Sequence, residues 1–321
     1  MSTVQDISAA VLRLHPLPKI KGHTDKDSRG RVFVIGGSAF SPGAALLAGE
    51  AALRGGAGKA CVGTTHTIAL SLALHAPEFG IYALAATSDG EPDAADRGIE
   101  RGAEQCDALL LGPGLMNENN GRLIAVRLMQ TLRVPMVLDS AAITGFSKDF
   151  ESIKAGRQPR ILTPHAGEMA KLLGIERDAV EESPRQMAES AARDLDCLMV
   201  LKGAETYIAT PDGEIFKFAG GVAGLATAGS GDTLAGLMVA LLARGATPLS
   251  ACLWSVFVHA KSGAVLSRKV GPLGFLAREL PGQFPRLLQS LEPPKKRRSG
   301  ISPKRGNRIR PQLKFPRDLS S

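Results

Sequence analysis

Residues 31–65 read RVFVIGGSAFSPGAALLAGEAALRGGAGKACVGTT, and this stretch decides the fold class. Apolar runs at 31–37 and 59–65 enclose a segment (42–56) that is rich in Ala and Leu and follows Ser41. Apolar residues on consecutive positions predict strands covered on both faces. Ser followed by Pro is typical of a helix N-terminus. The stretch therefore predicts a strand, a helix and a second, parallel strand.

The same alternation continues to about residue 270. Further helices are predicted after Ser183-Pro184 and after Thr247-Pro248, where a capping hydroxyl again precedes Pro. Pro211-Asp212-Gly213 predicts a β-hairpin instead. We expect an α/β fold with a mainly parallel central sheet and helices on both sides. Further strands are predicted at 108–114, 134–140, 160–165 and 198–203.

Length and composition are those of a protein with a packed core. The chain has 321 residues, of which 44% are hydrophobic, and a mean hydropathy of +0.03. These values argue against a disordered protein. The sequence has no run of about 18 apolar residues, and its first residues lack a signal-peptide pattern. We therefore expect a cytoplasmic protein with no membrane partner.

The net charge of +8 comes from one end of the chain. Residues 293–321 hold ten of the 39 Lys and Arg residues and a single acid, Asp318, which leaves 29 basic against 30 acidic residues elsewhere. This basic, Pro-containing segment is typical of a disordered tail. We predict one domain over residues 1–292 followed by a tail. A tail of this composition more often increases solubility. Non-specific binding to nucleic acid is the less favoured interpretation.

The cysteines indicate a reducing compartment. Cys61, Cys106, Cys197 and Cys252 stand singly in apolar stretches, without the spacing of zinc ligands or of a disulfide framework. We expect all of them to be small buried hydrophobic residues.

Small and polar residues follow five of the predicted strands. Ligands of open parallel sheets bind beyond the carboxyl ends of the strands, so these positions predict a cleft at one edge of the sheet. The segments concerned are 36–38 (GGS), 112–114 (GPG), 139–140 (DS), 163–165 (TPH) and 202–203 (KG).

The strongest local motif is ATAGSGDTLAG at 226–236, which runs into the apolar segment LMVALLARG. Glycines before a helix let a phosphate approach free backbone N–H groups at the positive end of the helix dipole. Asp232 lies in the first turn, where it either caps the helix or accepts a proton from a hydroxyl group. The dinucleotide fingerprint would need a third glycine at Leu234, and no GxxxxGK[ST] motif occurs.

Other polar residues have both a structural and a functional interpretation. Lys202 ends an apolar run and is either a surface lysine or a cation at a strand end. His165 and Glu168 lie three apart at a helix start, where the histidine is more often structural. Asp139 either holds substrate or caps a turn, and His259 is expected to be a structural residue within a helix.

Taken in order, six motifs resemble those of the NAD(P)H-hydrate dehydratases of the ribokinase-like superfamily. They are the segment 35–62, LLGPGL, VLDS, LTPHAGE, LKGAET and GLATAGSGDTLAG. The resemblance covers roughly residues 20–285 and implies a three-layer α/β/α fold. It also implies a hydro-lyase reaction, in which the C6 hydroxyl of the S form of hydrated NADH or NADPH leaves at the expense of a nucleotide. Bacterial members generally use ADP and eukaryotic members ATP, with Mg²⁺.

The resemblance also assigns site residues. Asp232 would be the catalytic base and would contact substrate. Other substrate contacts would come from Ala44, Gly114 and His165. Glu168 would orient magnesium and its water indirectly. The phosphate hole would consist of Gly229, Ser230 and Gly231, and the nucleotide would be bound by Lys202, Gly203, Ala204, Glu205, Thr206 and Gly231.

Two departures from the family pattern bear on function. Met116 follows GPGL where relatives usually have Gly. Many relatives carry an epimerase domain, whereas here about 30 residues precede the first predicted strand. We therefore expect a separate NAD(P)H-hydrate epimerase upstream. The family resemblance also implies a homotetramer.

Two other functions fit some of the same residues. A small-molecule kinase for a vitamin-precursor alcohol shares the Gly-Asp loop, but would release a stable phosphate ester instead of free phosphate. A nucleic-acid-associated protein would need its basic tail, so deletion of residues 293–321 would abolish function.

Overall fold

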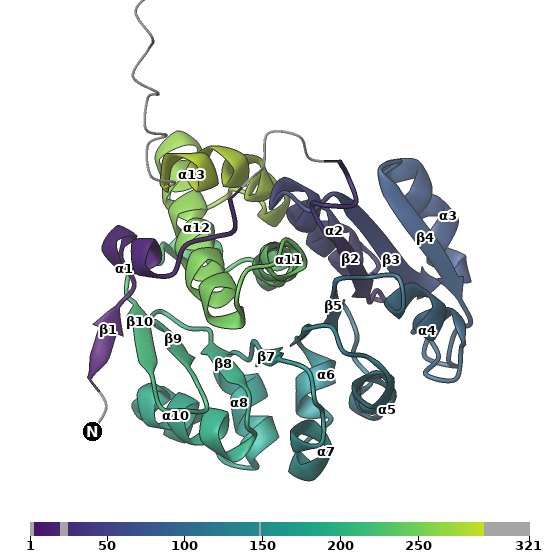
Figure 1. Ribbon diagram of the computed structural model, residues 1–321, viewed down its shortest axis with the longest axis horizontal. Helices are drawn as coiled ribbons and strands as arrows, with labels where there is room; N and C mark the ends of the chain where they lie inside the picture. The colour runs from purple at the N-terminus through teal and green to yellow at the C-terminus, as the bar shows by residue number, and fades with distance from the viewer. Residues whose placement is uncertain (1–2, 20–24, 148, 292–321) are drawn as a thin grey trace, which may run out of the picture.

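The computed structural model describes residues 3–19, 25–147 and 149–291; the predicted tail lies outside them. In this part of the chain, ten strands form one sheet in the order β1-β10-β9-β8-β7-β6-β5-β2-β3-β4 (Figure 1). The strands are β1 (Val4–Asp6), β2 (Arg31–Ile35), β3 (Lys59–Thr65), β4 (Phe79–Leu84), β5 (Ala108–Leu111), β6 (Met136–Leu138), β7 (Arg160–Leu162), β8 (Leu198–Leu201), β9 (Thr206–Ala209) and β10 (Ile215–Phe218).

The sheet is mainly parallel, as predicted. All neighbouring strands pair in parallel except β8 with β9 and β9 with β10, which are antiparallel. The predicted βαβ unit is present, because β2 and β3 pair in parallel on either side of a helix. The hairpin is also confirmed, and Gly213 takes the positive φ of +93° that its turn requires.

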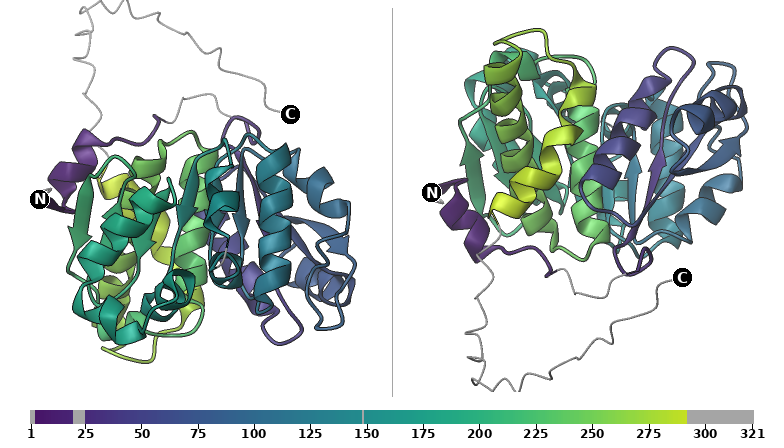
Figure 2. Two further views of the ribbon diagram at one scale, coloured as in Figure 1. Left: turned by 90° about the horizontal axis from the view of Figure 1, so that it is seen from below. Right: turned by 90° about the horizontal axis from the view of Figure 1, so that it is seen from above.

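Helices cover both faces of the sheet, so the predicted three-layer fold is confirmed (Figure 2). One layer contains α1 (Ala9–Leu14), α2 (Gly43–Arg54), α3 (His66–His75), α11 (Ser230–Ala243), α12 (Pro248–Lys269) and α13 (Phe284–Leu291). The other contains α4 (Gly98–Ala103), α5 (Glu118–Thr131), α6 (Ala141–Thr144), α7 (Phe150–Lys154), α8 (Ala166–Leu173), α9 (Arg177–Glu182) and α10 (Pro184–Asp194).

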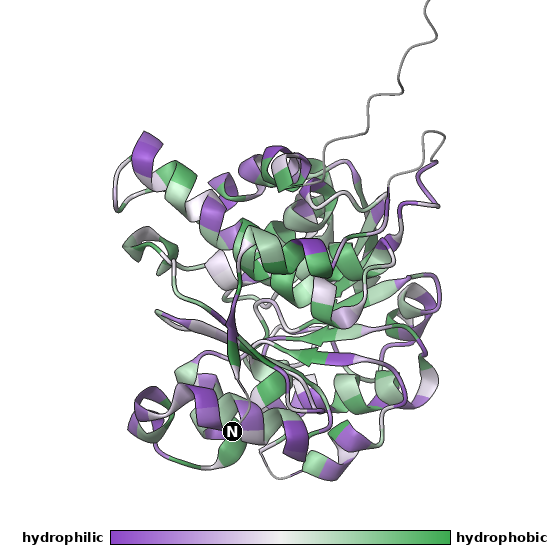
Figure 3. Cartoon of the chain, turned by 60° about the vertical axis from the view of Figure 1, so that its left-hand side comes forward, coloured by the Kyte–Doolittle hydropathy of each residue, from purple (hydrophilic) through white to green (hydrophobic). Residues whose placement is uncertain are grey.

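The central strands are apolar on consecutive positions because each of their faces meets one helical layer. In β2, Val34 packs into the core on the α11 side, whereas Phe33 and Ile35 pack into the core on the α5 side. Successive side chains of a strand point to opposite faces. Figure 3 accordingly shows mainly hydrophobic strands and polar residues concentrated on the outer helices.

Helices begin at the predicted positions, but only some of the predicted capping hydrogen bonds are present. Thr247 accepts a hydrogen bond from the backbone N–H of Ser250, as expected for an N-cap. Ser183 occupies the N-cap position of α10 without a side-chain cap bond, and the N-cap of α2 is Pro42 instead of Ser41. The N–H of Ser41 donates to Ser38 Oγ, so this loop turns before the helix begins.

Two strands at the edges of the sheet were not predicted. β4 contains Gly80, which weakens a strand pattern, and β1 has only three residues. β1 pairs with β10, from Val4 opposite Ile215 to Asp6 opposite Lys217. The expectation that the sheet begins near residue 31 was therefore wrong, because a distant strand supplies the partner of the N-terminal segment.

The four cysteines are free thiols, as expected. Cys106, Cys197 and Cys252 are buried, but Cys61 on β3 is only half-buried, which corrects the prediction for that residue. Cys61 lies next to the edge strand β4, where less chain covers the sheet.

α12 has 22 residues and is apolar enough, by length and composition alone, to cross a membrane. However, 78% of its most apolar window is buried inside the protein. α12 packs against α11 and α13 and contributes Leu253, Trp254 and Val258 to the core. These contacts are those of a core helix.

α11 is buried along most of its length between α2 and α12 (Figure 1). It approaches α2 so closely that a Cβ on Gly236 would lie 2.2 Å from the carbonyl oxygen of Ala48. A glycine is required here because two helix backbones meet.

We expect Gly236→Ala to lower the free energy of unfolding by about 1–3 kcal/mol, because the extra methyl must push α2 away. Urea denaturation followed by circular dichroism measures this loss. Gly282→Ala is the matched control, since a Cβ there meets no atom within 4 Å. Equal midpoints for Gly236→Ala and the wild type would contradict the packing argument.

Candidate active site

The Gly-rich motif forms the N-terminus of α11. Gly229 is its N-cap with φ +86°, a conformation that favours glycine, and the helix begins at Ser230. Asp232 is therefore a first-turn residue and not the cap, so the capping interpretation was wrong. The first N–H groups of a helix have no acceptor within it, and here they stand at the positive end of a helix of 14 residues. This geometry suits a phosphate group.

Lys202 brings a positive charge to the same place. A Cβ on Gly231 would lie 3.3 Å from Lys202 Nζ, so the ammonium group lies against the backbone of the first turn of α11. Only 18% of the Lys202 side chain is exposed, so it is not the surface lysine that its sequence also allowed. Lys202 follows β8 directly and is held by a backbone hydrogen bond to Pro164.

Asp139 is the ion-pair partner of Lys202. Its Oδ1 lies 2.8 Å from Lys202 Nζ and also accepts a 2.6 Å hydrogen bond from Thr163 Oγ1. Asp139 is 2% exposed, so both charges of the pair are largely withdrawn from water. The next residue, Ser140, takes a positive φ of 52°, which is strained for a non-glycine residue. Three parallel strands, β6, β7 and β8, thus place these groups at one edge of the sheet.

Glu168 and His165 lie beside this pair. They form a capping box at the start of α8, in which His165 Nδ1 accepts the N–H of Glu168 and Glu168 Oε2 accepts the N–H of His165. Glu168 Oε2 is also 3.9 Å from Lys202 Nζ. The His165 side chain is 58% exposed, and since Nδ1 is an acceptor, Nε2 carries the ring proton. His165 Nε2 lies 3.3 Å from Glu168 Oε1, so its proton is on the side of that carboxylate.

The three carboxylates around Lys202 titrate differently. Burial raises the pKa of Asp139, but the charge of Lys202 and hydrogen bonds outweigh burial and hold it below its ordinary value. Burial, and then the charge of Asp139, raises the pKa of Asp232 from 3.8 to about 7 against the opposing effect of Lys202. Burial likewise raises the pKa of Glu168. Burial lowers the pKa of Lys202, but Asp139 and Glu168 raise it overall. Asp232 is thus poised to exchange a proton near neutral pH.

The predicted substrate residues Ala44 and Gly114 are in contact. A Cβ on Gly114, which has φ +75°, would lie 2.9 Å from Ala44 Cβ and 2.6 Å from the carbonyl oxygen of Ser41. The start of α2 and the loop after β5 therefore form one small-residue surface. A Cβ on Gly229 would lie 2.5 Å from Cδ1 of Leu47, which is also on α2. The same helix therefore connects this surface to the phosphate motif.

The predicted nucleotide segment is a loop between β8 and β9. Gly203 and Ala204 are exposed, and Thr206 begins β9. The Glu205 carboxylate accepts a hydrogen bond from Tyr207 and pairs with Lys217 at 3.2 Å. Glu205 therefore braces the loop against the hairpin with its side chain, which leaves the backbone of the segment available to a ligand.

His259 lies within α12 and is buried, as predicted for a structural residue. Its Nε2 is 3.0 Å from the carbonyl oxygen of Ser230 and 3.2 Å from Ser230 Oγ. Burial lowers the pKa of His259 to about 4, so the ring is neutral and Nε2–H donates to the carbonyl. His259 thus supports the first residue of α11 from behind.

The sequence placed Asp139 and Thr163 at the predicted cleft, and left Asp139 either to hold substrate or to cap a turn, but it did not predict that they meet Lys202. Both residues come directly after apolar runs in the sequence. That position alone could not show that their side chains meet Lys202. A buried carboxylate and a buried ammonium at the ends of nearby strands form the expected pair.

Comparisons with known proteins show the family of this chain. A family model described as NAD(P)H-hydrate dehydratase matches residues 32–286. The chain is 43% identical over 288 residues to the ADP-dependent (S)-NAD(P)H-hydrate dehydratase of Xanthomonas campestris, covering 90% of this chain and 97% of that protein. It is 34% identical to a bifunctional NAD(P)H-hydrate repair enzyme of Moorella thermoacetica, and spans about half (52%) of that protein.

Solved structures give the same result. An ADP/ATP-dependent NAD(P)H-hydrate dehydratase of Bacillus subtilis, co-crystallised with ATP and Mg²⁺, has a TM-score of 0.78 at 28% identity, covering 90% of this chain and 99% of that one. A ribokinase-like superfamily protein of Enterococcus faecalis has a TM-score of 0.74 at 25% identity, covering 90% and 96%. The resemblance inferred from the sequence motifs is confirmed: the chain belongs to the NAD(P)H-hydrate dehydratase family of ribokinase-like proteins.

Proposed function

We propose that this chain converts the S form of hydrated NADH and NADPH back to NADH and NADPH, with ADP as the phosphoryl donor. The observation that carries the proposal is the placement of Asp232. It lies in the first turn of a Gly-capped helix, beside the buried Lys202–Asp139 pair, and has a pKa of about 7. A carboxylate of that kind can accept a proton from a hydroxyl group within reach of a phosphate.

In the proposed reaction, Asp232 takes the proton of the C6 hydroxyl as its oxygen attacks the terminal phosphorus of ADP. The bond between that phosphorus and the bridging oxygen breaks, and AMP leaves. The ring nitrogen then donates its lone pair, the C6–O bond breaks, and inorganic phosphate departs more readily than hydroxide would. Loss of a proton from C5 restores the reduced nicotinamide. Hydrate and ADP thus give NADH or NADPH, AMP, phosphate and a proton.

The protein's part in this reaction is positioning and charge stabilisation. The N–H groups of Gly229 and Gly231 would bind the transferring phosphoryl group, whereas the N–H of Ser230 already donates to the carbonyl oxygen of Thr227 at 3.2 Å. The ammonium of Lys202 lies against the same turn. The segment from Lys202 to Thr206 would bind the rest of the nucleotide. Ala44, Gly114 and His165 would contact the hydrated dinucleotide.

Mg²⁺ fits this site only as a companion of the nucleotide. In the described part of the chain, no group of three or more His, Cys, Asp or Glu residues could hold a metal ion. Mg²⁺ commonly keeps several waters and binds substrate phosphates. We propose that Glu168 orients one such water, with the ion supplying positive charge to the phosphates.

The remaining proposals rest on the family resemblance. A separate epimerase would supply the S form where the hydrate has the R form. The protein would be a cytoplasmic homotetramer.

The direct test is the near-ultraviolet absorbance of reduced nicotinamide, followed with hydrated NADH, Mg²⁺ and either ADP or ATP. A rise that needs nucleotide, with free phosphate as product, is expected, and ADP should be the better donor. A stable phosphate ester without a rise in absorbance would instead establish a small-molecule kinase.

The pH dependence tests the role of Asp232. Only its ionised form can accept the proton, so we expect kcat/KM to fall as the pH decreases below about 7, the pKa of this group. The measurement is kcat/KM between mildly acidic and mildly alkaline pH, at constant ionic strength. An acidic limb at the ordinary pKa of an aspartate would contradict the assignment.

A further inference from the structure

The first turn of α11 has no side-chain cap. Its N-cap is Gly229, which has no side chain that could accept a hydrogen bond from the turn. The N–H of Ser230 donates to the carbonyl oxygen of Thr227, but among the described residues none accepts the N–H of Gly231. Gly231 is only half-buried, so this part of the turn is open to a ligand. The helix start must therefore be held in place in some other way.

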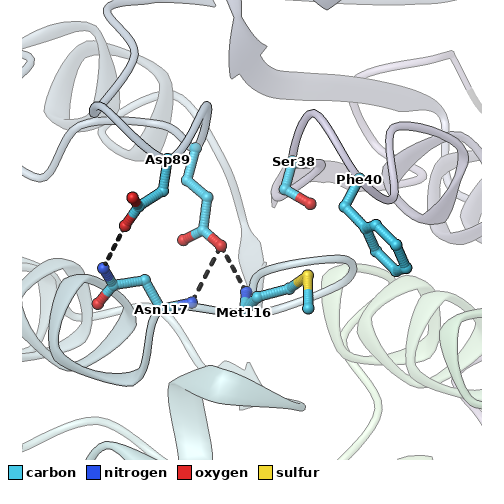
Figure 4. A pocket seen from close by; sticks show the side chains of 6 residues that line it. Ser38, Phe40, Asp89, Met116 and Asn117 are labelled. Carbon is cyan, nitrogen blue, oxygen red and sulfur yellow. Dashed lines mark hydrogen bonds between the residues drawn. The ribbon is translucent and has the colours of Figure 1, made fainter.

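The start of α5 shows the usual arrangement. Asn117 Oδ1 accepts the N–H of Asn120 at 3.0 Å, as an N-cap side chain does. Just before the helix, Glu91 Oε1 accepts the N–H groups of Met116 and Asn117 at 2.6 and 3.0 Å (Figure 4). Such contacts fix a helix start, but they occupy the N–H groups that a ligand would need.

His259 holds the first turn of α11 from its carbonyl side. Its Nε2 lies 3.0 Å from the carbonyl oxygen of Ser230, and since a carbonyl oxygen can only accept, Nε2 carries the ring proton. Thr233 Oγ1 donates to the same oxygen at 2.8 Å. The side chains of both donors belong to buried residues. Two buried donors thus converge on one carbonyl group of this turn.

That carbonyl group belongs to the same peptide unit as the N–H of Gly231. Because a peptide unit is planar, hydrogen bonds that hold its oxygen also fix the direction of its N–H. They polarise the unit as well, which strengthens the N–H as a donor. The ammonium of Lys202 lies beside this residue, since a Cβ on Gly231 would be 3.3 Å from Nζ. A phosphate at this point would therefore meet an oriented N–H and a positive charge.

The other buried polar side chains of this part of α12 make a different kind of contact. Ser255 and Ser262 donate to carbonyl groups of their own helix, whereas His259 donates to another helix. Its neighbours in the core of α12 include Leu253 and Val258, and burying an imidazole among apolar groups costs free energy unless it is hydrogen-bonded. The bond that compensates for this cost is made to the turn that the proposed reaction uses.

We propose that His259 is a positioning residue for phosphoryl transfer, which acts with Thr233 to direct the N–H of Gly231 at the transferring phosphoryl group. This inference rests on the proposed function. His259 is buried behind α11, so it acts through the peptide unit between Ser230 and Gly231. A preorganised donor contributes most where charge develops in the transition state. Loss of His259 should therefore reduce kcat more than it reduces the affinity for ADP.

The test compares His259→Leu with His259→Gln. Leucine fills a similar volume without a donor, whereas the glutamine amide can again donate to the carbonyl of Ser230. Removing a donor of this kind outright costs about 10²- to 10³-fold in kcat, and here the donor is misdirected and not removed. We expect His259→Leu to lower kcat by about tenfold and to weaken ADP binding by at most about threefold. His259→Gln should recover most of kcat.

The absorbance assay gives kcat and KM, and calorimetry gives the Kd for ADP. The pH profile adds a readout that separates positioning from proton transfer. Burial lowers the pKa of His259 to about 4, so the ring is neutral near pH 7. The acidic limb of kcat/KM that belongs to Asp232 should therefore keep its position in His259→Leu while the plateau falls.

Two further variants separate positioning from stability. Thr233→Val keeps the branched shape and removes the second donor to the carbonyl of Ser230, so it should lower kcat by a smaller factor than His259→Leu. Ser262→Ala is the matched control, because it removes a buried 2.8 Å hydrogen bond to the carbonyl of Val258 within α12. Any change in its urea midpoint should come without a loss of kcat.

The outcomes distinguish this inference from the proposed reaction. Wild-type kcat in folded His259→Leu, or an equal loss in His259→Gln, would overturn the inference and leave the reaction intact. If circular dichroism shows that His259→Leu is unfolded, an unchanged kcat in Thr233→Val overturns it.

A wild type that binds ADP without any nucleotide-dependent turnover would overturn the reaction. The Kd for ADP then decides the inference: weaker binding by His259→Leu or Thr233→Val supports it, and equal affinities overturn it. Failure of the wild type to bind ADP would overturn both.

Discussion

Asp232→Asn is expected to lower kcat by about 10²-fold or more while ADP still binds, because the amide cannot accept the hydroxyl proton. The substitution keeps the size and shape of the side chain in the first turn of α11. The glycines that shape the phosphate site and the Lys202–Asp139 pair stay in place, so ground-state binding of ADP should change little. The measurement is turnover at saturating hydrate and ADP, with the Kd for ADP from calorimetry.

The same variant should gain stability at alkaline pH. The pKa of Asp232 is raised in the folded protein, so its contribution to stability is fully present below the unfolded value of 3.8 and is lost as the pH rises through about 7. Asn has no such dependence, so the variant should be at least as stable as the wild type above pH 7. Asp212→Asn, at an exposed turn position, is the control and should change neither property. Wild-type turnover in Asp232→Asn would remove this residue from the mechanism.

Lys202→Met is expected to reduce the free energy of unfolding by about 3–5 kcal/mol at neutral pH, because it leaves the buried Asp139 carboxylate without its partner. Asp139 is 2% exposed and 2.8 Å from the ammonium, so water cannot replace the lost charge. Nucleotide-dependent turnover should also fall below detection, since the same ammonium lies beside the phosphate-binding turn. Urea denaturation measures the stability loss.

Three comparisons separate this effect from lost packing. The double variant with Asp139→Asn should recover much of the loss, because no unpaired charge remains. The loss should also shrink toward acidic pH: the folded pKa of Asp139 lies below 3.8 only while Lys202 is present, so the wild type has this stability above that value and loses it as the pH falls. Lys154→Met breaks a surface ion pair with Glu151 and should cost at most about 1 kcal/mol. A loss that is independent of pH and of Asp139 would indicate packing alone.

Much of the fold could be predicted because its signals are local. The runs at 31–37 and 59–65 are apolar on consecutive positions, and the structure places strands at Arg31–Ile35 and Lys59–Thr65 in parallel pairing. The strand Val4–Asp6 could not be predicted, because three residues carry almost no periodicity. Its only reason to be extended is its pairing with residues 215–217, more than 200 positions away.

The candidate site also contains residues that the sequence could predict and residues that it could not. The motif at 226–236 predicted a phosphate-binding helix start because glycine, helix and first-turn acid are neighbours in sequence, and α11 begins where expected. Glu91, which is 1% exposed and has one carboxylate oxygen without a hydrogen-bond partner among the described residues, carried no sequence signal at all. The burial of that oxygen depends on every loop around it.

The amino-acid sequence by itself therefore determined the α/β class through short-range propensity and hydrophobic patterning, the family through the resemblance of its motifs, and the glycine-rich start of α11. Only the tertiary structure decided that Lys202 pairs with Asp139, 63 positions away, and that burial raises the pKa of Asp232 to about 7. The physical reason is that charge interactions and desolvation depend on distance and burial in space. Both quantities exist only once the strand ends have been brought to one edge of the sheet.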